Sequence, residues 1–108
     1  MKIRNIIFVL SCFFSGSVFA GETTGKVNLL YVHGYNDFIL FSMISAQPGF
    51  ASCAVTGRYA ISTSTQQGKN IFSTILAAKA ANLTITVSGK STCTTHGDAE
   101  DISAIVVN

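Results

Sequence analysis

The side chains best suited to chemistry gather in one short stretch near the end of the chain. The sequence STCTTHGDAED, residues 91–101, contains Cys93, His96, Asp98, Glu100 and Asp101. Imidazole and carboxylate groups are ligands for zinc or for a harder cation. Their spacing matches neither a His-Glu-x-x-His zinc helix nor a calcium-binding EF-hand loop. We therefore expect a polar loop whose acids stay in water and no metal, with a site on His96 and Asp98 as the alternative.

Catalysis finds little support elsewhere in the chain. No serine lies in a Gly-x-Ser-x-Gly elbow, and no glycine-rich loop for phosphate is present. The carboxylates at 98, 100 and 101 crowd one segment, whereas the two acids of a glycosidase must flank the substrate. We predict no enzymatic activity and no cofactor, with a small hydrolase centred on His96 as the alternative.

A second candidate site is the turn around Tyr35. This tyrosine follows Gly34 and precedes Asn36 and Asp37. An exposed aromatic ring can stack on the apolar face of a sugar, while fixed polar groups bind its hydroxyls. Tyr35, Asn36 and Asp37 are therefore our candidate ligand-binding residues. The alternative is a hairpin turn whose tyrosine only covers the end of the fold.

The first twenty residues resemble a secretory signal peptide. A basic start is followed by an apolar run and by small residues, which predicts cleavage after Ala20 and a secreted or periplasmic location. The apolar run is too short to span a membrane, so we expect no stable membrane insertion. The alternative is a lipoprotein acylated at Cys12, because residues 9–12 resemble a bacterial lipobox.

Removal of residues 1–20 leaves 88 of the 108 residues, enough for one small domain. Lys2 and Arg4 belong to the removed segment, so five of the seven basic residues remain against five acidic ones. A chain without basic excess cannot neutralise a phosphate backbone, and we expect no nucleic acid partner.

The cysteine count agrees with export. Cys53 and Cys93 are the two cysteines after residue 20, and an even count in an oxidising compartment predicts a disulfide. Such a bridge closes a loop of about 41 residues, which contributes roughly 4 kcal/mol in the chain-entropy model. The alternatives are free or intermolecular thiols.

The pattern of apolar residues predicts a single domain over residues 26–108, preceded by a flexible N-terminus at 21–25. Alternating or apolar runs predict five strands, at 26–32, 38–44, 58–62, 83–88 and 102–107. The one helix occupies 70–82, with Asn70 as its cap and Asn82 in the left-handed position at its end. The last strand is apolar almost throughout, so we expect burial on both faces, within the sheet or at a subunit contact.

The resulting order, β-β-β-α-β-β, is the connectivity of the OB-fold, a five-stranded barrel. An open α+β sheet with the helix packed on one face is the alternative.

This combination of barrel-like order, export and one disulfide resembles the B subunits of AB5 toxins. The resemblance implies assembly into a ring and binding of host glycans, and it assigns no individual residue. We predict a secreted or periplasmic, non-enzymatic binding domain, and the resemblance adds carbohydrate binding and homo-oligomers to this expectation. The alternative is a periplasmic protein–protein interaction module or inhibitor that uses an exposed strand edge.

Overall fold

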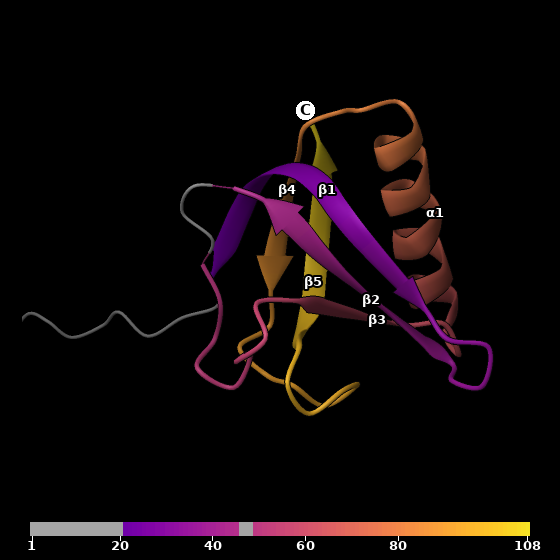
Figure 1. The fold of residues 1–108 in the computed structure, drawn as a ribbon, viewed down its shortest axis with the longest axis vertical. Helices are drawn as coiled ribbons and strands as arrows, with labels where there is room; N and C mark the ends of the chain where they lie inside the picture. Colours follow the sequence, from indigo (N-terminus) through magenta and orange to yellow (C-terminus); the bar gives the residue numbers. More distant parts are fainter. Residues whose placement is uncertain (1–20, 46–48) are drawn as a thin grey trace, which may run out of the picture.

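The computed structural model describes residues 21–45 and 49–108. The predicted signal peptide and the alternative lipid site at Cys12 lie outside the described residues. The elements follow one another as β1 (Glu22–Val32), β2 (Phe38–Ile44), β3 (Tyr59–Ser62), α1 (Gln66–Ala80), β4 (Ile85–Gly89) and β5 (Glu100–Val107) (Figure 1). The protein is thus mainly β with one helix, in the predicted order.

The five strands close into a barrel in the order β1-β2-β3-β5-β4. All neighbouring strands are antiparallel except β3 and β5, which run parallel. The ring is completed by β4, which pairs with the first residues of β1, and α1 runs alongside the strands (Figure 1). An open sheet, the alternative prediction, is therefore wrong.

Strand β1 takes part in two pairings and begins earlier than predicted. Its first residues, Glu22–Gly25, pair with β4, and the residues from Lys26 onward pair with β2. The prediction that 21–25 is a flexible N-terminus is therefore wrong. The buried hydroxyl of Thr23 hydrogen-bonds the Tyr59 hydroxyl at 2.8 Å, so a polar residue faces the core here. Small and polar composition concealed this part of the strand.

The interior of the barrel is filled by one apolar cluster. Its buried members come from all five strands and from α1: Val27, Ile39, Phe41, Tyr59, Ile61, Ile75, Ala78, Ile85, Val87 and Ile102. Burial of such side chains contributes about 25 cal/mol per Å² of apolar surface. The helix therefore contributes Ile75 and Ala78 to the core that the barrel strands enclose.

A second, smaller apolar cluster lies at Leu40, Ala60 and Ala99, with Tyr31 and Phe38 packed against it. Leu40 and Ala60 alternate with core residues along β2 and β3, so they point away from the main core. Ala99 belongs to the connection between β4 and β5. This connection therefore covers the outer face of β2 and β3.

Helix α1 begins four residues before the predicted start. Thr65 is its N-cap and accepts a hydrogen bond from the amide of Gly68 at 3.0 Å. A side chain at Gly68 would collide with the carbonyl of Ser62, so glycine allows the close approach. Asn70 lies inside the helix, and its assignment as the cap is wrong. Asn82 has a φ of 58°, which confirms the left-handed position at the end of the helix.

Strand β5 also differs from its prediction. It pairs with β4 from Ile102 to Val107 and with β3 only at Glu100 and Asp101. The strand is buried at its start, whereas Val106 and Val107 at its end are 56% and 44% exposed. The expected burial on both faces is therefore wrong within this chain, because β3 ends where β5 continues.

A disulfide joins Cys53 to Cys93, as predicted, with the two Cα atoms 6.1 Å apart. It connects the β2–β3 connection to the β4–β5 loop. Because disulfides persist in oxidising compartments, this bridge indicates a location outside the cytoplasm. Within the described part of the chain, no helix has the length and apolar character needed to cross a membrane.

Candidate functional site

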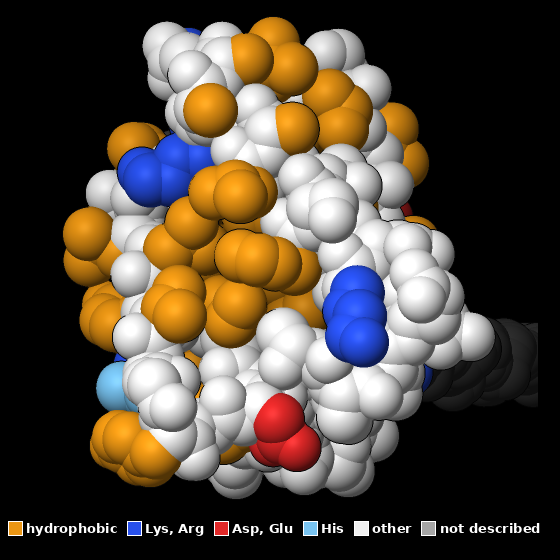
Figure 2. Space-filling model, turned by 90° about the vertical axis from the view of Figure 1, so that its right-hand side faces the viewer, with side chains coloured by type: hydrophobic (Ala, Val, Ile, Leu, Met, Phe, Trp, Pro, Cys, Tyr) orange, Lys and Arg blue, Asp and Glu red, His pale blue; other side chains and the backbone are white. Residues whose placement is uncertain are grey.

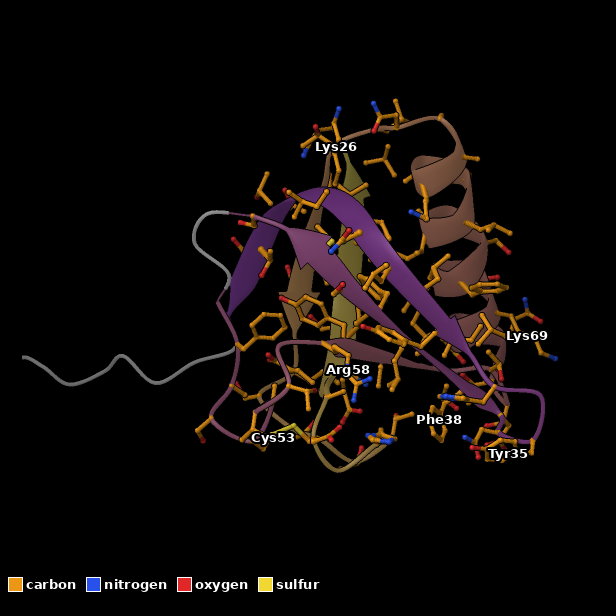
Figure 3. All side chains as sticks on the ribbon, viewed as in Figure 1. Lys26, Tyr35, Phe38, Cys53, Arg58 and Lys69 are labelled. Atoms are coloured by element: carbon orange, nitrogen blue, oxygen red, sulfur yellow. A yellow bond between two sulfur atoms is a disulfide. The ribbon has the colours of Figure 1, made fainter. Side chains whose placement is uncertain are left out.

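Three connections meet at one end of the barrel: the β1–β2 turn (residues 33–37), the β3–α1 link (63–65) and the β4–β5 loop (90–99). The amide of Thr63 donates to the carbonyl of Asp37 at 2.9 Å, which joins the first two. In Figure 3, Phe38 and Tyr35 are both seen at the lower right of the molecule. We describe this end as the candidate site.

Asp101 organises the β4–β5 loop. It is 6% exposed, and its Oδ2 accepts from the hydroxyls of Thr92 at 2.7 Å and Thr94 at 2.6 Å. The amide of Thr94 also donates to Oδ2 at 2.9 Å, and the amide of Thr95 donates to Oδ1 at 3.0 Å. Burial by itself would raise the pKa of this carboxyl, but these four hydrogen bonds outweigh it and lower the pKa well below its usual range. Asp101 therefore stays ionised and holds the loop.

Glu100 is fully buried and ties the same loop to the β2–β3 connection. Its Oε1 accepts from the amide of Ala51 at 2.8 Å, and its Oε2 accepts from the amide of Ser91 at 3.0 Å. A Cβ at Gly89 would collide with the Glu100 carboxylate, so glycine leaves the room that this side chain needs. The expectation that the acids stay in water is therefore wrong for Glu100 and Asp101.

The third acid, Asp98, remains partly exposed and lies beside His96. Its Oδ1 is 2.6 Å from His96 Nδ1 and 3.4 Å from Arg58 Nη2. The structure thus brings together the two residues that we considered as metal ligands. No group of three or more His, Cys, Asp and Glu side chains that could hold a metal ion occurs over residues 21–45 and 49–108. In this arrangement Asp98 serves an ion pair with Arg58.

Aromatic rings form the outer part of the site. The His96 ring meets the Phe38 ring edge-on, with centroids 5.0 Å apart. The Arg58 guanidinium lies over the ring of Tyr31, 5.0 Å from its centroid. These contacts fix the inner aromatic groups of the site in place.

The predicted residues occupy the turn beside this cluster. Tyr35 is 85% exposed, and its ring lies 5.7 Å from the ring of His33. Asp37 is exposed and Asn36 is half-buried. The amide of Asn36 donates to the carbonyl of His33 at 3.4 Å, which closes the turn. The turn therefore presents Tyr35 to solvent with its face available.

A pocket of about 220 Å³ opens between the end of β3, the start of α1 and the β4–β5 loop. It arises because β3 and β5 diverge after two paired residues. Most of the polar lining carries hydroxyl groups, beside one amide, one ammonium and one carboxylate: Ser62, Thr65, Gln67, Lys90, Thr92, Thr94, Thr95 and Asp101. The apolar part includes Ile61, Ile71 and Ile102. These residues were not predicted as site residues, because only the folded chain brings them together.

The pocket adjoins the aromatic cluster. Ser62 of the lining pairs with Phe38 across β2 and β3, and Thr95 immediately precedes His96. The arrangement thus combines a hydroxyl-lined recess with aromatic surface. Comparison of the chain with protein-family models, with curated proteins and with solved structures finds no match.

Proposed function

We propose that the protein is a non-enzymatic, carbohydrate-binding domain that acts outside the cytoplasm. The observation that carries this proposal is the hydroxyl-lined pocket beside an exposed aromatic turn. Small-ligand sites combine apolar or aromatic surface with a few placed polar groups. In our proposal Tyr35 stacks on the sugar, Asn36 and Asp37 bind hydroxyls at the rim, and the pocket takes the inner part of the ligand.

The architecture supports this assignment. We interpret the barrel as OB-fold-like, and such barrels bind oligosaccharides or oligonucleotides on the β2–β3 face and the neighbouring loops. Residues 21–108 contain five basic and five acidic side chains, so they lack the basic excess that an oligonucleotide requires. The proposed location is secreted or periplasmic after cleavage at Ala20, and the nearest functional analogy is a toxin B subunit.

A glycan array tests the proposal. Tyr35→Ala removes the stacking face, and we expect its glycan signal to fall by about tenfold or more, because aromatic contacts contribute strongly to binding. The matched control is Val55→Ala, since Val55 is also highly exposed but lies in another connection. Equal signals from Tyr35→Ala and the wild type would show that the turn does not bind glycans.

A second candidate function is protein–protein interaction, and a specific feature of β5 favours it. Beyond Asp101 this strand pairs with β4 alone, and Val106 and Val107 near its end are exposed. An unpaired strand edge can accept a further strand from a partner or from a second copy. The face of the molecule that carries α1 also gathers apolar side chains (Figure 2).

Native mass spectrometry tests self-association. If β5 mediates it, the wild type forms oligomers and Val106→Lys reduces them to monomers. A wild type that is monomeric at high concentration would count against self-association and leave a different protein as the partner in this second function.

A further inference from the structure

Two hydroxyl groups of the pocket lining already donate their hydrogens to Asp101. Thr92 Oγ1 and Thr94 Oγ1 lie 2.7 Å and 2.6 Å from Asp101 Oδ2, and both threonines line the pocket. An ionised carboxylate only accepts hydrogen bonds, so each threonine must donate its single hydroxyl hydrogen to Asp101. Only the lone pairs of these two oxygens remain for a ligand.

The two threonines keep donating to Asp101 because this residue is held in its ionised form. The amides of Thr94 and Thr95 donate to the same carboxylate, at 2.9 Å and 3.0 Å. Three of the four donors contact Oδ2 and one contacts Oδ1, so the oxygen that holds both hydroxyls is fully engaged. Burial opposes ionisation, yet the hydrogen bonds prevail and the pKa of Asp101 lies below its usual range. The hydroxyl orientation therefore persists at neutral pH.

The polarity of the pocket wall formed by Thr92 and Thr94 is thus fixed by their hydrogen bonds to Asp101. Thr92 and Thr94 offer acceptors toward the ligand, whereas the ammonium of Lys90, which also lines the pocket, offers only donors. Both threonine oxygens contact the same atom of Asp101, so they lie close enough to be reached by neighbouring hydroxyls of one sugar ring.

We propose that this pocket selects sugars that donate hydroxyl hydrogens to Thr92 and Thr94, and that Asp101 is the positioning residue behind this selection. The inference rests on the carbohydrate-binding function proposed above. A ligand that offers only acceptors at this wall, such as a fluorinated sugar, a carboxylate or a phosphate, leaves lone pairs facing one another. Sites built for hydrogen bonding discriminate strongly against analogues that leave their polar groups unpaired.

Deoxyfluoro sugars test the donor requirement, since fluorine replaces a hydroxyl without a hydrogen to donate. The probes are the methyl glycosides of glucose, galactose, mannose and N-acetylglucosamine, followed by the monodeoxyfluoro series of the tightest of these, all measured by isothermal titration calorimetry. We expect fluorination at one or two neighbouring positions to weaken binding by about fivefold or more, the value of one hydrogen bond.

Three outcomes are distinguishable. Loss at one or two neighbouring positions supports the inference. Binding of a methyl glycoside that no fluorination weakens overturns it and leaves the proposed function intact. Failure of all four methyl glycosides to bind overturns the proposed function together with the inference.

Substitutions test whether the threonine hydroxyls cause the loss of affinity on fluorination. Thr92→Val and Thr94→Val retain the shape of the side chain but remove one acceptor each. Each variant should bind the parent glycoside about fivefold more weakly than the wild type does. Its affinity for the critical fluoro analogue, the one that the wild type binds weakly, should be unchanged. Thr24→Val, an exposed threonine of β1 outside the pocket lining, is the matched control. Wild-type affinity for the parent glycoside in both valine variants would overturn the inference.

Asp101→Asn tests the positioning role through selectivity. The amide nitrogen donates, so it frees at least one threonine hydroxyl to donate to the ligand. Discrimination against the critical fluoro analogue should then fall below about twofold, provided that near-UV circular dichroism shows a native fold. Unchanged discrimination in a folded Asp101→Asn would contradict the role. If this variant does not fold, the two valine variants decide the question.

Discussion

The two sides of the candidate site are held in very different ways. On the β4–β5 loop, Asp101 accepts four hydrogen bonds, Glu100 binds Ser91, and Cys93 is bonded to Cys53. On the β1–β2 turn, Asn36 donates one long backbone hydrogen bond, and Asp37 accepts one from Thr63. The loop is preorganised, which lowers the entropic cost of binding, whereas the turn can adjust its tyrosine to the ligand.

The disulfide is expected to make the largest contribution to this difference. The paired substitution Cys53→Ala and Cys93→Ala should lower the free energy of unfolding by about 4 kcal/mol, because the unfolded chain is no longer constrained. Urea denaturation measures the change, with Val55→Ala as the control from the same connection. A loss below about 1 kcal/mol would mean that the buried carboxylates alone hold the loop.

Asp101 is expected to come next. Asp101→Ala leaves the amides of Thr94 and Thr95 and two threonine hydroxyls without their acceptor, and should cost about 3 kcal/mol in free energy of unfolding. The matched variant is Asp98→Ala in the same segment, where a partly exposed ion pair contributes at most about 1 kcal/mol. Equal losses in the two variants would contradict the special role of Asp101.

The pH dependence sharpens the same contrast. The pKa of Asp101 in the folded protein lies below its ordinary value of 3.8, so the unfolded chain takes up a proton first as the pH falls. The stability from this group is complete above pH about 5 and is lost progressively in more acidic solution. Urea denaturation from pH 7 to pH 2 should show this decline, and Asp101→Asn should reduce it. An equally steep decline in that variant would assign the acid sensitivity to other groups.

The turn is expected to give the smallest effect on stability. Tyr35→Ala should change the free energy of unfolding by no more than about 0.5 kcal/mol, because the side chain is 85% exposed. The same urea measurement tests this, beside the loss of glycan signal expected for the variant. A large loss of stability would show that the tyrosine has a structural role and is not free to bind.

The order of elements and the disulfide could be predicted from local signals. Alternation of apolar residues shows where strands run, and the cysteine count is sufficient for the bridge. The start of β1 was missed because Thr23 satisfies its hydroxyl with Tyr59, a partner 36 positions away. The local pattern around such a polar residue predicts a loop, because its hydrogen-bond partner is distant in the sequence.

The candidate site was predictable only in part. The sequence singles out the turn at Tyr35, but it presents Glu100 and Asp101 as solvated acids. Their burial depends on amides from other segments, among them Ala51, which no local pattern connects to the acids. The sequence did contain one signal for the burial of Asp101. Three threonines at 92, 94 and 95 lie close to it in the chain, and they can supply hydrogen-bond donors to its carboxylate. The pocket itself follows from the divergence of β3 and β5, which is a property of the folded barrel.

The most direct test of the central claim, that a sugar binds at this end of the barrel, is chemical-shift mapping by NMR. A ¹⁵N-labelled protein is titrated with the tightest-binding methyl glycoside of the four. We predict that the amides of Thr92, Thr94, Thr95 and Tyr35 shift with one common affinity, while the amide of Val55 stays in place. Shifts confined to the exposed end of β5, or no shifts at saturating glycoside, would contradict the account.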